Sequence, residues 1–320
     1  NDGVDPKSGL QIGPRSGAPG TFETFDSIKQ AYRAQLEYFI DLKIEGNNII
    51  ERLYAHLMPS PFMSVLMDDC IIRATDYHNG GARYNTTYIQ GVGLGTTTDS
   101  LSAIRHHVFD ETSIGLQDLL EAMESNFADN ESMRLKLERQ SPSYGNDDER
   151  ADDITQYLFD TYLELLDGRP NTKGGNYRVN LLPTTVHIFF GSVTGASANG
   201  RRSGEAVSEG ISPSHGADTQ GPTAVVKSAS RIDHAKTGGT LLNMKFTPSV
   251  FRDTGKARVR DLIRTYFTLG GHHIQFNVVD RATLEDAQKH PEEYRDLIVR
   301  VAGYSDYFVT IGKDLQDEII

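Results

Sequence analysis

The sequence is poor in cysteine, in long apolar runs and in excess positive charge. Its 320 residues include a single cysteine, Cys70, which excludes an internal disulfide framework and fits a reducing compartment. No apolar run approaches the length of a membrane-spanning helix, and no secretory signal is recognisable. The net charge of −12 argues against nucleic acid and anionic membranes as partners. We therefore expect a cytoplasmic protein that binds neither of them.

The composition is that of a soluble globular protein of one or two domains, with 38% hydrophobic and 24% charged residues. A helix is expected to begin at Thr24 or Asp26 and to end before Pro59, because apolar residues recur there at three- and four-residue steps. Asp99 is expected to cap the next helix. The chain does not begin with methionine, and an uncapped helical pattern runs to Ile320, so we expect a piece of a longer protein.

The second half of the sequence alternates strand-like and helical patterns. Such alternation favours an α/β sheet that closes like a barrel. Beyond residue 99, we expect helices in both halves of the chain, over residues 100–109, 114–126, 131–139, 150–166, 222–230, 256–269, 283–289 and 291–297. The expected strands are 177–191, 240–246 and 272–279, and residues 62–70 are expected to be buried.

Two features that often mark functional sites are better explained as structural here. The run Gly91-x-Gly93-x-Gly95 lacks the spacing and the strand–turn–helix setting of a dinucleotide site, so a structural loop is favoured. Cys70 follows two aspartates, Asp68 and Asp69, which raise the pKa of a thiol and disfavour a nucleophile.

The histidines and the loop acids leave several possibilities open. The pairs His106-His107 and His272-His273 are adjacent in sequence, so their side chains should diverge, and we expect no metal site. His187 and His273 lie on expected strands, where each could face a pocket. Three acids lie in unusual loops, where carboxylates are commonly caps or surface residues. These acids are Glu209, Asp218 and Asp233.

Gly303 lies in the short run Arg300-Val301-Ala302-Gly303-Tyr304-Ser305, between two amphipathic segments. Taken alone, it would be a turn glycine. However, this run and the later Leu315–Ile320 resemble the C-terminal signature of the glycyl radical enzymes. Six further blocks resemble that family in the same order. They are Asn79–Asn85 with Gln90–Gly93, Gly191–Ala196 with Gly200-Arg201, Glu209–Pro213, Gly221–Ala224, Gly239–Phe246 and His273–Val279.

The resemblance implies that Gly303 stores an organic radical. An amide nitrogen and a carbonyl flank the glycine Cα and delocalise the unpaired electron, and the missing Cβ lets the centre flatten. In this family, a separate activating enzyme that uses S-adenosylmethionine and an iron–sulfur cluster removes the hydrogen atom, so no cofactor or metal is expected on the chain itself. The radical then passes to a cysteine. That cysteine and a catalytic glutamate are expected upstream of this sequence, and Cys70 does not match them, so this chain alone is expected to be inactive.

The implied fold is a ten-stranded α/β barrel of two parallel half-sheets surrounded by helices. Residues 1–166 would form the mainly helical C-terminal part of the pyruvate formate-lyase-type domain, and residues 167–320 the glycine radical domain. The implied protein is a homodimer whose partners are its activating enzyme and a small substrate. Residues 182–187 and 270–273 are most similar to the hydroxyproline dehydratase and isethionate sulfite-lyase branches.

The resemblance implies a lyase that cleaves a C–O or C–S bond in a small polar substrate. Two alternatives stay open, a formate C-acetyltransferase and a non-catalytic radical carrier subunit. On an inward-facing strand, Thr184 or Thr185 would contact the substrate, and alternation along the strand allows only one of them to do so. Equally, both threonines could be packing residues.

Overall fold

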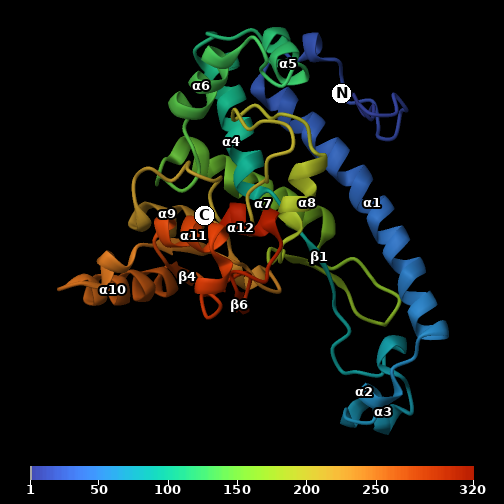
Figure 1. Ribbon diagram of the computed structural model, residues 1–320. Helices are drawn as coiled ribbons and strands as arrows, with labels where there is room; N and C mark the ends of the chain where they lie inside the picture. The colour runs from blue at the N-terminus through green and yellow to red at the C-terminus, as the bar shows by residue number, and fades with distance from the viewer. Residues whose placement is uncertain (1) are drawn as a thin grey trace. The chain divides into compact units, whose positions relative to one another are not determined.

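The computed structural model describes residues 2–320, which form two compact units (Figure 1). One unit contains the residues up to Ile89 together with Asp160–Val179. The other contains Gln90–Phe159 and Asn180–Ile320. The helix α7 (Glu149–Leu166) therefore contributes residues to both units.

The first unit is dominated by the long helix α1 (Phe25–Leu57), blue in Figure 1. Its expected N-terminal cap is confirmed, because the Thr24 side chain accepts a hydrogen bond from the Ser27 backbone N–H in a capping box. Two short helices follow, α2 (Pro61–Ser64) and α3 (Asp68–Arg73).

The prediction that residues 62–70 are buried was wrong for most of this segment. Phe62 is 79% exposed and Leu66 is 71% exposed, whereas Cys70 is buried. An apolar run predicts burial only when another element covers it, and in the described residues this one is largely uncovered.

The loop after α3 leads into a small sheet of β1 (Thr87–Gln90) and β2 (Tyr177–Asn180). Glu51 of α1 ties this region together. Its carboxylate accepts hydrogen bonds from the Thr172 backbone N–H, at 3.3 Å, and from the Thr172 hydroxyl, at 2.7 Å. One of its oxygens also lies 3.2 Å from Lys173 Nζ, so polar contacts hold α1 to the loop that precedes β2.

The second unit begins with α4 (Leu94–Ile104), which continues into a π-helical turn, Arg105–Asp110. The prediction that Asp99 caps a helix was wrong. Asp99 is buried inside α4, where Oδ1 accepts a hydrogen bond from the Tyr144 backbone N–H at 2.7 Å. The N-cap residue of α4 is instead Gly93, whose φ of +80° favours glycine. The helices α5 (Leu116–Glu124) and α6 (Glu131–Gln140) follow.

The strand predicted over residues 177–191 was wrong beyond Asn180. The strand β2 ends there, and residues 186–193 form the helix α8 (Val186–Val193). Pro183 lies between the two elements, and a proline lacks the N–H that a strand needs to continue its hydrogen-bond ladder. Thr184 and Thr185 therefore lie in the connection and not on a strand.

The C-terminal part contains most of the predicted elements, with shorter strands than expected. The strands β3 (Asn243–Phe246) and β4 (Gln275–Val278) pair in parallel, with Asn243 opposite Gln275 and Lys245 opposite Asn277. The helices here are α9 (Pro222–Ala229), α10 (Gly255–Thr268) and α11 (Arg281–Lys289). The helix predicted at 291–297 is only a 3₁₀ turn, Pro291–Glu293.

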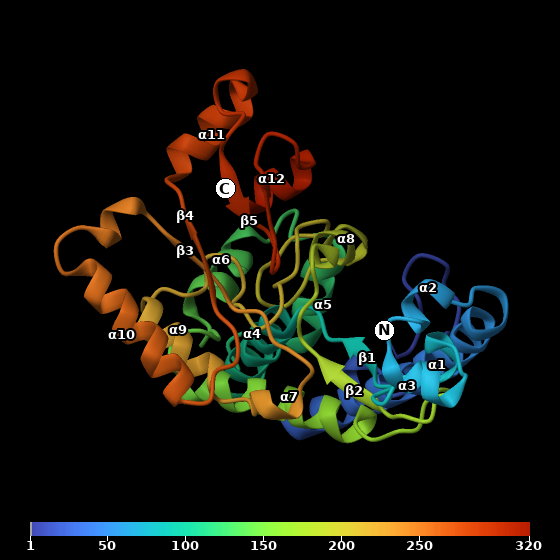
Figure 2. The ribbon, with the colours of Figure 1, turned by 90° about the horizontal axis from the view of Figure 1, so that it is seen from below.

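The chain then forms an antiparallel hairpin of β5 (Ile298–Arg300) and β6 (Ser305–Tyr307), followed by α12 (Lys313–Ile319). Figure 2 shows α11, α12 and β5 grouped together. An apolar cluster joins the hairpin to α11 and α12. It contains Leu241, Leu284, Ala287, Val299, Val301, Ala302, Phe308 and Ile319.

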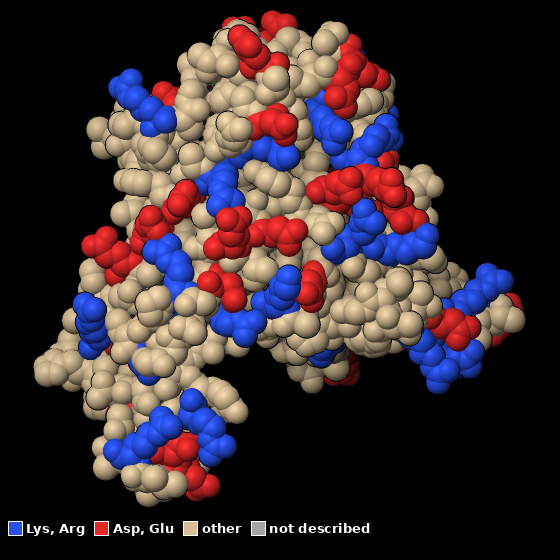
Figure 3. Space-filling model, turned by 180° about the vertical axis from the view of Figure 1, so that it is seen from behind, with Lys and Arg blue, Asp and Glu red and all other residues tan. Residues whose placement is uncertain are grey.

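The sheets of residues 2–320 are three pairs of strands, of which β3–β4 is parallel. The ten-stranded barrel is thus not formed by the described residues alone. None of the helices in residues 2–320 is at once long and apolar enough to cross a bilayer. On the face drawn in Figure 3, basic and acidic side chains are interspersed and do not form separate areas of one sign.

Candidate functional site

Gly303 lies at the tip of the β5–β6 hairpin. Arg300 pairs with Ser305, and beyond this pair the Val301 backbone N–H donates to the Tyr304 carbonyl at 2.9 Å, which closes the turn. Gly303 has a φ of +77°, and its residue is exposed in this chain. The two preceding residues, Val301 and Ala302, are buried, so apolar packing as well as the hydrogen bond holds the turn in place.

Space does not explain why this position is glycine. A Cβ atom added at Gly303 would meet no heavy atom within 4 Å. The positive φ disfavours most side chains, which explains a preference for glycine but does not require it, since asparagine and aspartate also adopt this conformation. Neither the available space nor the backbone conformation therefore requires glycine at this position, and the chemistry of the Cα atom is a further possible reason for it.

The hairpin turn is held by two carboxamide side chains of β4. Gln275 Oε1 accepts a hydrogen bond from the Gly303 backbone N–H at 3.0 Å, and Gln275 Nε2 donates to the Val301 carbonyl at 3.1 Å. Asn277 makes two hydrogen bonds to the backbone of Arg300, each 2.8 Å long. Gln275 and Asn277 are two residues apart, so both side chains point from the same face of the strand.

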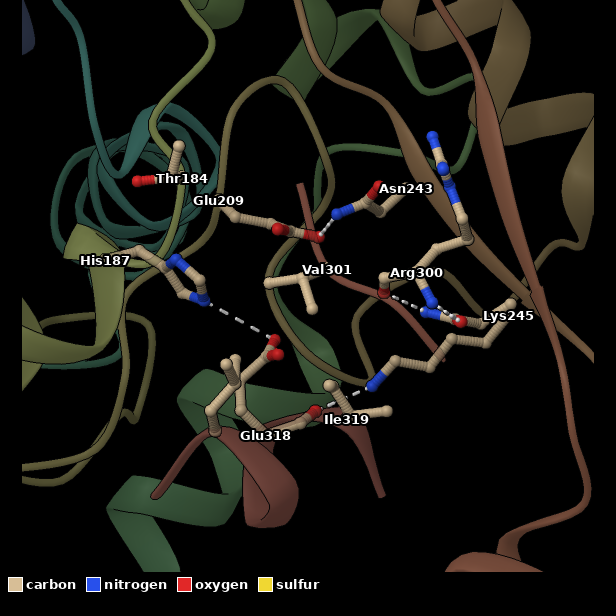
Figure 4. Close-up of a pocket in the computed structure, with 11 residues that line it drawn as sticks. Thr184, His187, Glu209, Asn243, Lys245, Arg300, Val301, Glu318 and Ile319 are labelled. Atoms are coloured by element: carbon tan, nitrogen blue, oxygen red, sulfur yellow. Dashed lines mark hydrogen bonds and ion pairs between the residues drawn. The ribbon is translucent and has the colours of Figure 1, made fainter. Parts of the chain in front are cut away.

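A small polar cavity of about 20 Å³ lies against this hairpin (Figure 4). This volume has room for about one water molecule. The hairpin, the β3–β4 pair, the connection before α8, α8 itself and α12 all contribute to its walls. The lining residues are Thr184, His187, Glu209, Asn243, Lys245, Asn277, Arg300, Val301, Leu315, Glu318 and Ile319.

Glu209 is the most perturbed acid of this cavity. Burial, followed by the nearby charge of Glu318, raises the pKa of Glu209 to about 7. The hydrogen bond that Asn243 Nδ2 donates to Glu209 Oε1, and the charges of His187 and Lys245, oppose this rise without cancelling it. Glu209 is therefore a carboxyl group that can hold or release a proton near neutral pH.

Glu318 of α12 is the second acid, and its pKa is shifted in the opposite direction. Burial acts to raise the pKa of Glu318, but the contact with His187 and the positive charge of Lys245 outweigh it and lower that pKa. His187 Nε2 lies 3.6 Å from Glu318 Oε1, and Lys245 Nζ donates to the Glu318 carbonyl at 2.7 Å (Figure 4). Two acids with pKa values shifted apart are a common arrangement in catalytic sites.

The structure separates the two threonines that the sequence analysis singled out. Thr184 lines the cavity, whereas Thr185 is the N-cap residue of α8 and is not part of the lining. His187 lines the cavity from α8, and neither ring nitrogen has a hydrogen-bond partner among the described residues. His273 is not part of the lining.

Sequence reasoning overlooked several residues that the fold brings to this region. The alternation of polar side chains along two strands was an available signal, because these positions face one side of a parallel pair. The overlooked residues on these strands are Asn243, Lys245, Gln275 and Asn277, and Glu318 of α12 was overlooked as well. Glu209 had been noted, but only as an acid in an unusual loop.

The remaining candidates lie elsewhere. Cys70 is buried and free in the first unit. Asp233 caps a 3₁₀ turn by accepting from the Ala235 backbone N–H. The expectation that His106 and His107 diverge was wrong, because in the π-helical turn their ring centroids lie 4.6 Å apart. Together with Glu111 they form a group whose ligand atoms lie within 4.8 Å of one another.

The Gly303 turn thus lies on a hairpin whose residues Arg300 and Val301 line a cavity with two perturbed acids, and the comparisons with known proteins identify the family. Residues 1–191 match the family model "pyruvate formate lyase-like", and residues 207–309, which include Gly303, match the model "glycine radical". The chain therefore belongs to the pyruvate formate lyase-like glycyl radical enzymes, and the resemblance seen in the sequence is confirmed.

Two curated relatives and one solved structure show which members it is similar to. It is 53% identical to trans-4-hydroxy-L-proline dehydratase of Clostridioides difficile, over 100% of this chain and 41% of the relative. It is 38% identical to isethionate sulfite-lyase of Oleidesulfovibrio alaskensis, over 97% of this chain and 38% of the relative. The crystal structure of hydroxyproline dehydratase from Clostridioides difficile superposes with a TM-score of 0.96 and 52% identity, over 100% of this chain and 41% of that structure. The chain thus spans about two fifths of the length of these relatives.

Proposed function

We propose that this chain is the radical-bearing part of a glycyl radical lyase that cleaves a C–O or C–S bond in a small polar substrate. The observation that carries the proposal is the position of Gly303 at the tip of a hairpin. The base of this hairpin packs in an apolar cluster, and the space around the Gly303 Cα is open. Relatives named for dehydration and for sulfite elimination match nearly the whole chain, which favours elimination over formate acetyltransfer or a radical-carrier role.

In this proposal, the Cα–H bond of Gly303 breaks homolytically, and the hydrogen atom goes to a radical supplied by an activating enzyme that uses S-adenosylmethionine. The Gly303 radical then takes a hydrogen atom from a cysteine thiol outside this chain, and the resulting thiyl radical takes one from the substrate. The leaving group then departs from the neighbouring carbon with the bonding electron pair, as water after protonation or as sulfite, while the substrate loses a proton. The resulting product radical takes a hydrogen atom back from the cysteine thiol, which restores the thiyl radical. A site shielded from water would protect these radicals from side reactions.

The relatives are longer than this chain, and we further propose that the whole protein folds as the ten-stranded barrel and forms a homodimer. The radical-bearing domain would begin at residue 167. Within it, Thr184 is the better candidate for a substrate contact than Thr185, since Thr184 lines the cavity beside the hairpin. Glu209 and His187 lie in the same lining, where they could exchange a proton with a bound polar group.

The substrate that the comparisons favour is trans-4-hydroxy-L-proline, because its dehydratase shares 53% identity with this chain. Isethionate is the second candidate, from relatives that share 38% identity. Dehydration would release water from C–O cleavage, and isethionate cleavage would release sulfite, so product analysis distinguishes them.

The test is anaerobic activation of the intact protein with its activating enzyme, followed by electron paramagnetic resonance and product analysis. Wild type is expected to give a doublet, because one hydrogen remains on the Gly303 Cα and couples to the unpaired electron. Gly303→Ala is expected to lose the signal and all turnover.

Gly312→Ala is the matched control, because a Cβ at Gly312 also meets no heavy atom within 4 Å and its φ is −61°. This control should keep both signal and turnover. A doublet that persists in Gly303→Ala would refute the storage of the radical at Gly303. Turnover of neither compound by radical-bearing wild type would refute both proposed substrates.

A further inference from the structure

We infer that Gln275 is a positioning residue for the radical, one that fixes the Gly303 amide and shapes how the unpaired electron spreads onto it. This inference rests on the proposed storage of the radical at Gly303. It starts from one contact: Gln275 Oε1 accepts the Gly303 N–H at 3.0 Å, so the carboxamide is hydrogen-bonded to the atom next to the reacting carbon.

The Gln275 carboxamide cannot turn freely. Its Nε2 donates to the Val301 carbonyl at 3.1 Å, which fixes the oxygen toward Gly303. Gln275 is only 6% exposed, and its backbone N–H donates to the Leu242 carbonyl at 3.0 Å as part of the parallel pair. A buried side chain with both polar ends satisfied is held in one geometry.

Asn277 supports the same turn from the next inward position of β4. Its Nδ2 donates to the Arg300 carbonyl and its Oδ1 accepts the Arg300 N–H, both at 2.8 Å. The two carboxamides therefore satisfy four backbone groups between residues 300 and 303. They take the place of a neighbouring strand, because the β5–β6 hairpin does not join the β3–β4 sheet.

This arrangement bears on the radical because of how a glycyl radical is stabilised. The nitrogen donates electron density to the Cα, and the carbonyl withdraws it. An acceptor on the N–H makes the nitrogen a better donor, so the Gln275 hydrogen bond places more spin on the nitrogen and stabilises the radical. Without this bond, the amide is free to rotate away from the plane that delocalisation requires.

The first measurement needs no radical and uses the intact, unactivated protein. Hydrogen–deuterium exchange at single-residue resolution reports whether the Gly303 N–H is bonded. Gln275→Met has nearly the same size and lacks both polar groups, and exchange at Gly303 should become about fivefold faster, the effect of one ordinary hydrogen bond. Gln275→Glu keeps an acceptor oxygen and should retain most of the protection.

The second measurement is electron paramagnetic resonance of the activated protein with ¹⁵N-labelled glycine. The nitrogen coupling of the radical should fall in Gln275→Met and be restored in Gln275→Glu, and the radical should decay about fivefold faster in Gln275→Met. Gln288→Met is the control, because the Gln288 amide contacts Gln316 and Asp317 and not the hairpin turn.

The outcomes separate this inference from the proposed function. Wild type without any glycyl doublet would refute the proposed function, while the exchange experiment would still test the contact. A doublet whose nitrogen coupling is the same in wild type and Gln275→Met would overturn the inference, even where exchange is faster. Should Gln275→Met fail to fold, a nitrogen coupling in Gln275→Glu that matches wild type supports the inference, and Gly303 exchange in Gln275→Glu as fast as in an unstructured peptide overturns it.

Discussion

Glu209 shows at the scale of one residue how a site imposes its chemistry on an ordinary carboxyl group. Its pKa lies at about 7 because the half-buried carboxyl group is largely desolvated and lies near the charge of Glu318, whose own pKa is lowered. The two acids share one cavity, so the charge is carried mainly by Glu318, which contacts His187 and lies close to Lys245. Near neutral pH, Glu209 is thus partly protonated.

This difference predicts how the stability of the protein depends on pH. Because the folded-state pKa of Glu209 is raised from 4.5 to about 7, its contribution to stability is present below pH 4.5 and is lost as the pH rises to 7. The shift corresponds to about 3 kcal/mol. Glu209→Gln cannot ionise, so it should match wild type near pH 4.5 and exceed it by up to about 3 kcal/mol at pH 8.

Chemical denaturation of the intact wild-type and Glu209→Gln proteins at several pH values from 4.5 to 8 measures this difference. Glu205→Gln is the control, because Glu205 is exposed and does not line the cavity. A stability difference between Glu209→Gln and wild type that stays constant over this range would contradict the prediction.

At the scale of elements, the buried side chain of Asp99 fixes the position of α4. The sequence had suggested that Asp99 would be the cap of a helix. Asp99 Oδ1 accepts from the Tyr144 N–H at 2.7 Å, and Oδ2 accepts from the Ser214 hydroxyl at 2.5 Å. Burial raises the pKa of Asp99 to about 7, although both hydrogen bonds oppose the rise. The side chain therefore joins the helix to two loops that are far apart in sequence.

Asp99→Ala leaves the Tyr144 N–H and the Ser214 hydroxyl without their partner, so it should destabilise the protein by about 2 kcal/mol. Asp99→Asn keeps one acceptor oxygen and should cost less than half as much. Thermal unfolding of the two variants beside wild type checks this order. Equal losses for Ala and Asn would show that the hydrogen bonds do not fix α4.

Local patterns predicted helices far better than strands. The helix α1 with its Thr24 cap was predicted correctly, because its periodic pattern is long and its cap is local. The run around Thr184 was misassigned, because a short apolar segment fits a buried helix as well as a strand. The turn that presents Gly303 was expected as a loop, but the strands on either side of it depend on pairing between residues 298–300 and 305–307.

At the scale of the whole molecule, the chain spans about two fifths of its relatives and holds the proposed radical store without the expected thiyl cysteine. Gly303 is exposed in this chain, so a radical stored there would be vulnerable wherever the rest of the protein does not cover it. Dioxygen adds to a carbon radical at once, and the resulting peroxyl radical leads to scission of the backbone at that carbon.

We therefore predict that air cleaves the activated, intact protein at Gly303 and releases a C-terminal peptide that contains Tyr304–Ile320. Mass spectrometry should find the truncated chain in proportion to the radical content before exposure. Unactivated protein and activated Gly303→Ala should stay intact. Cleavage in these two controls, or a full-length chain after exposure of radical-bearing wild type, would contradict the assignment.

The sequence by itself determined the family, the position of Gly303 and the long helices, because these depend on local motifs and on periodicity along the chain. Only the tertiary structure decided that Gln275 and Asn277 form hydrogen bonds to the backbone of the Gly303 turn. It also decided that Glu209, Glu318 and His187 line one cavity. Contacts between residues 28 or 109 positions apart are set by how strands pair and helices pack, and the order of residues along the chain does not encode them locally.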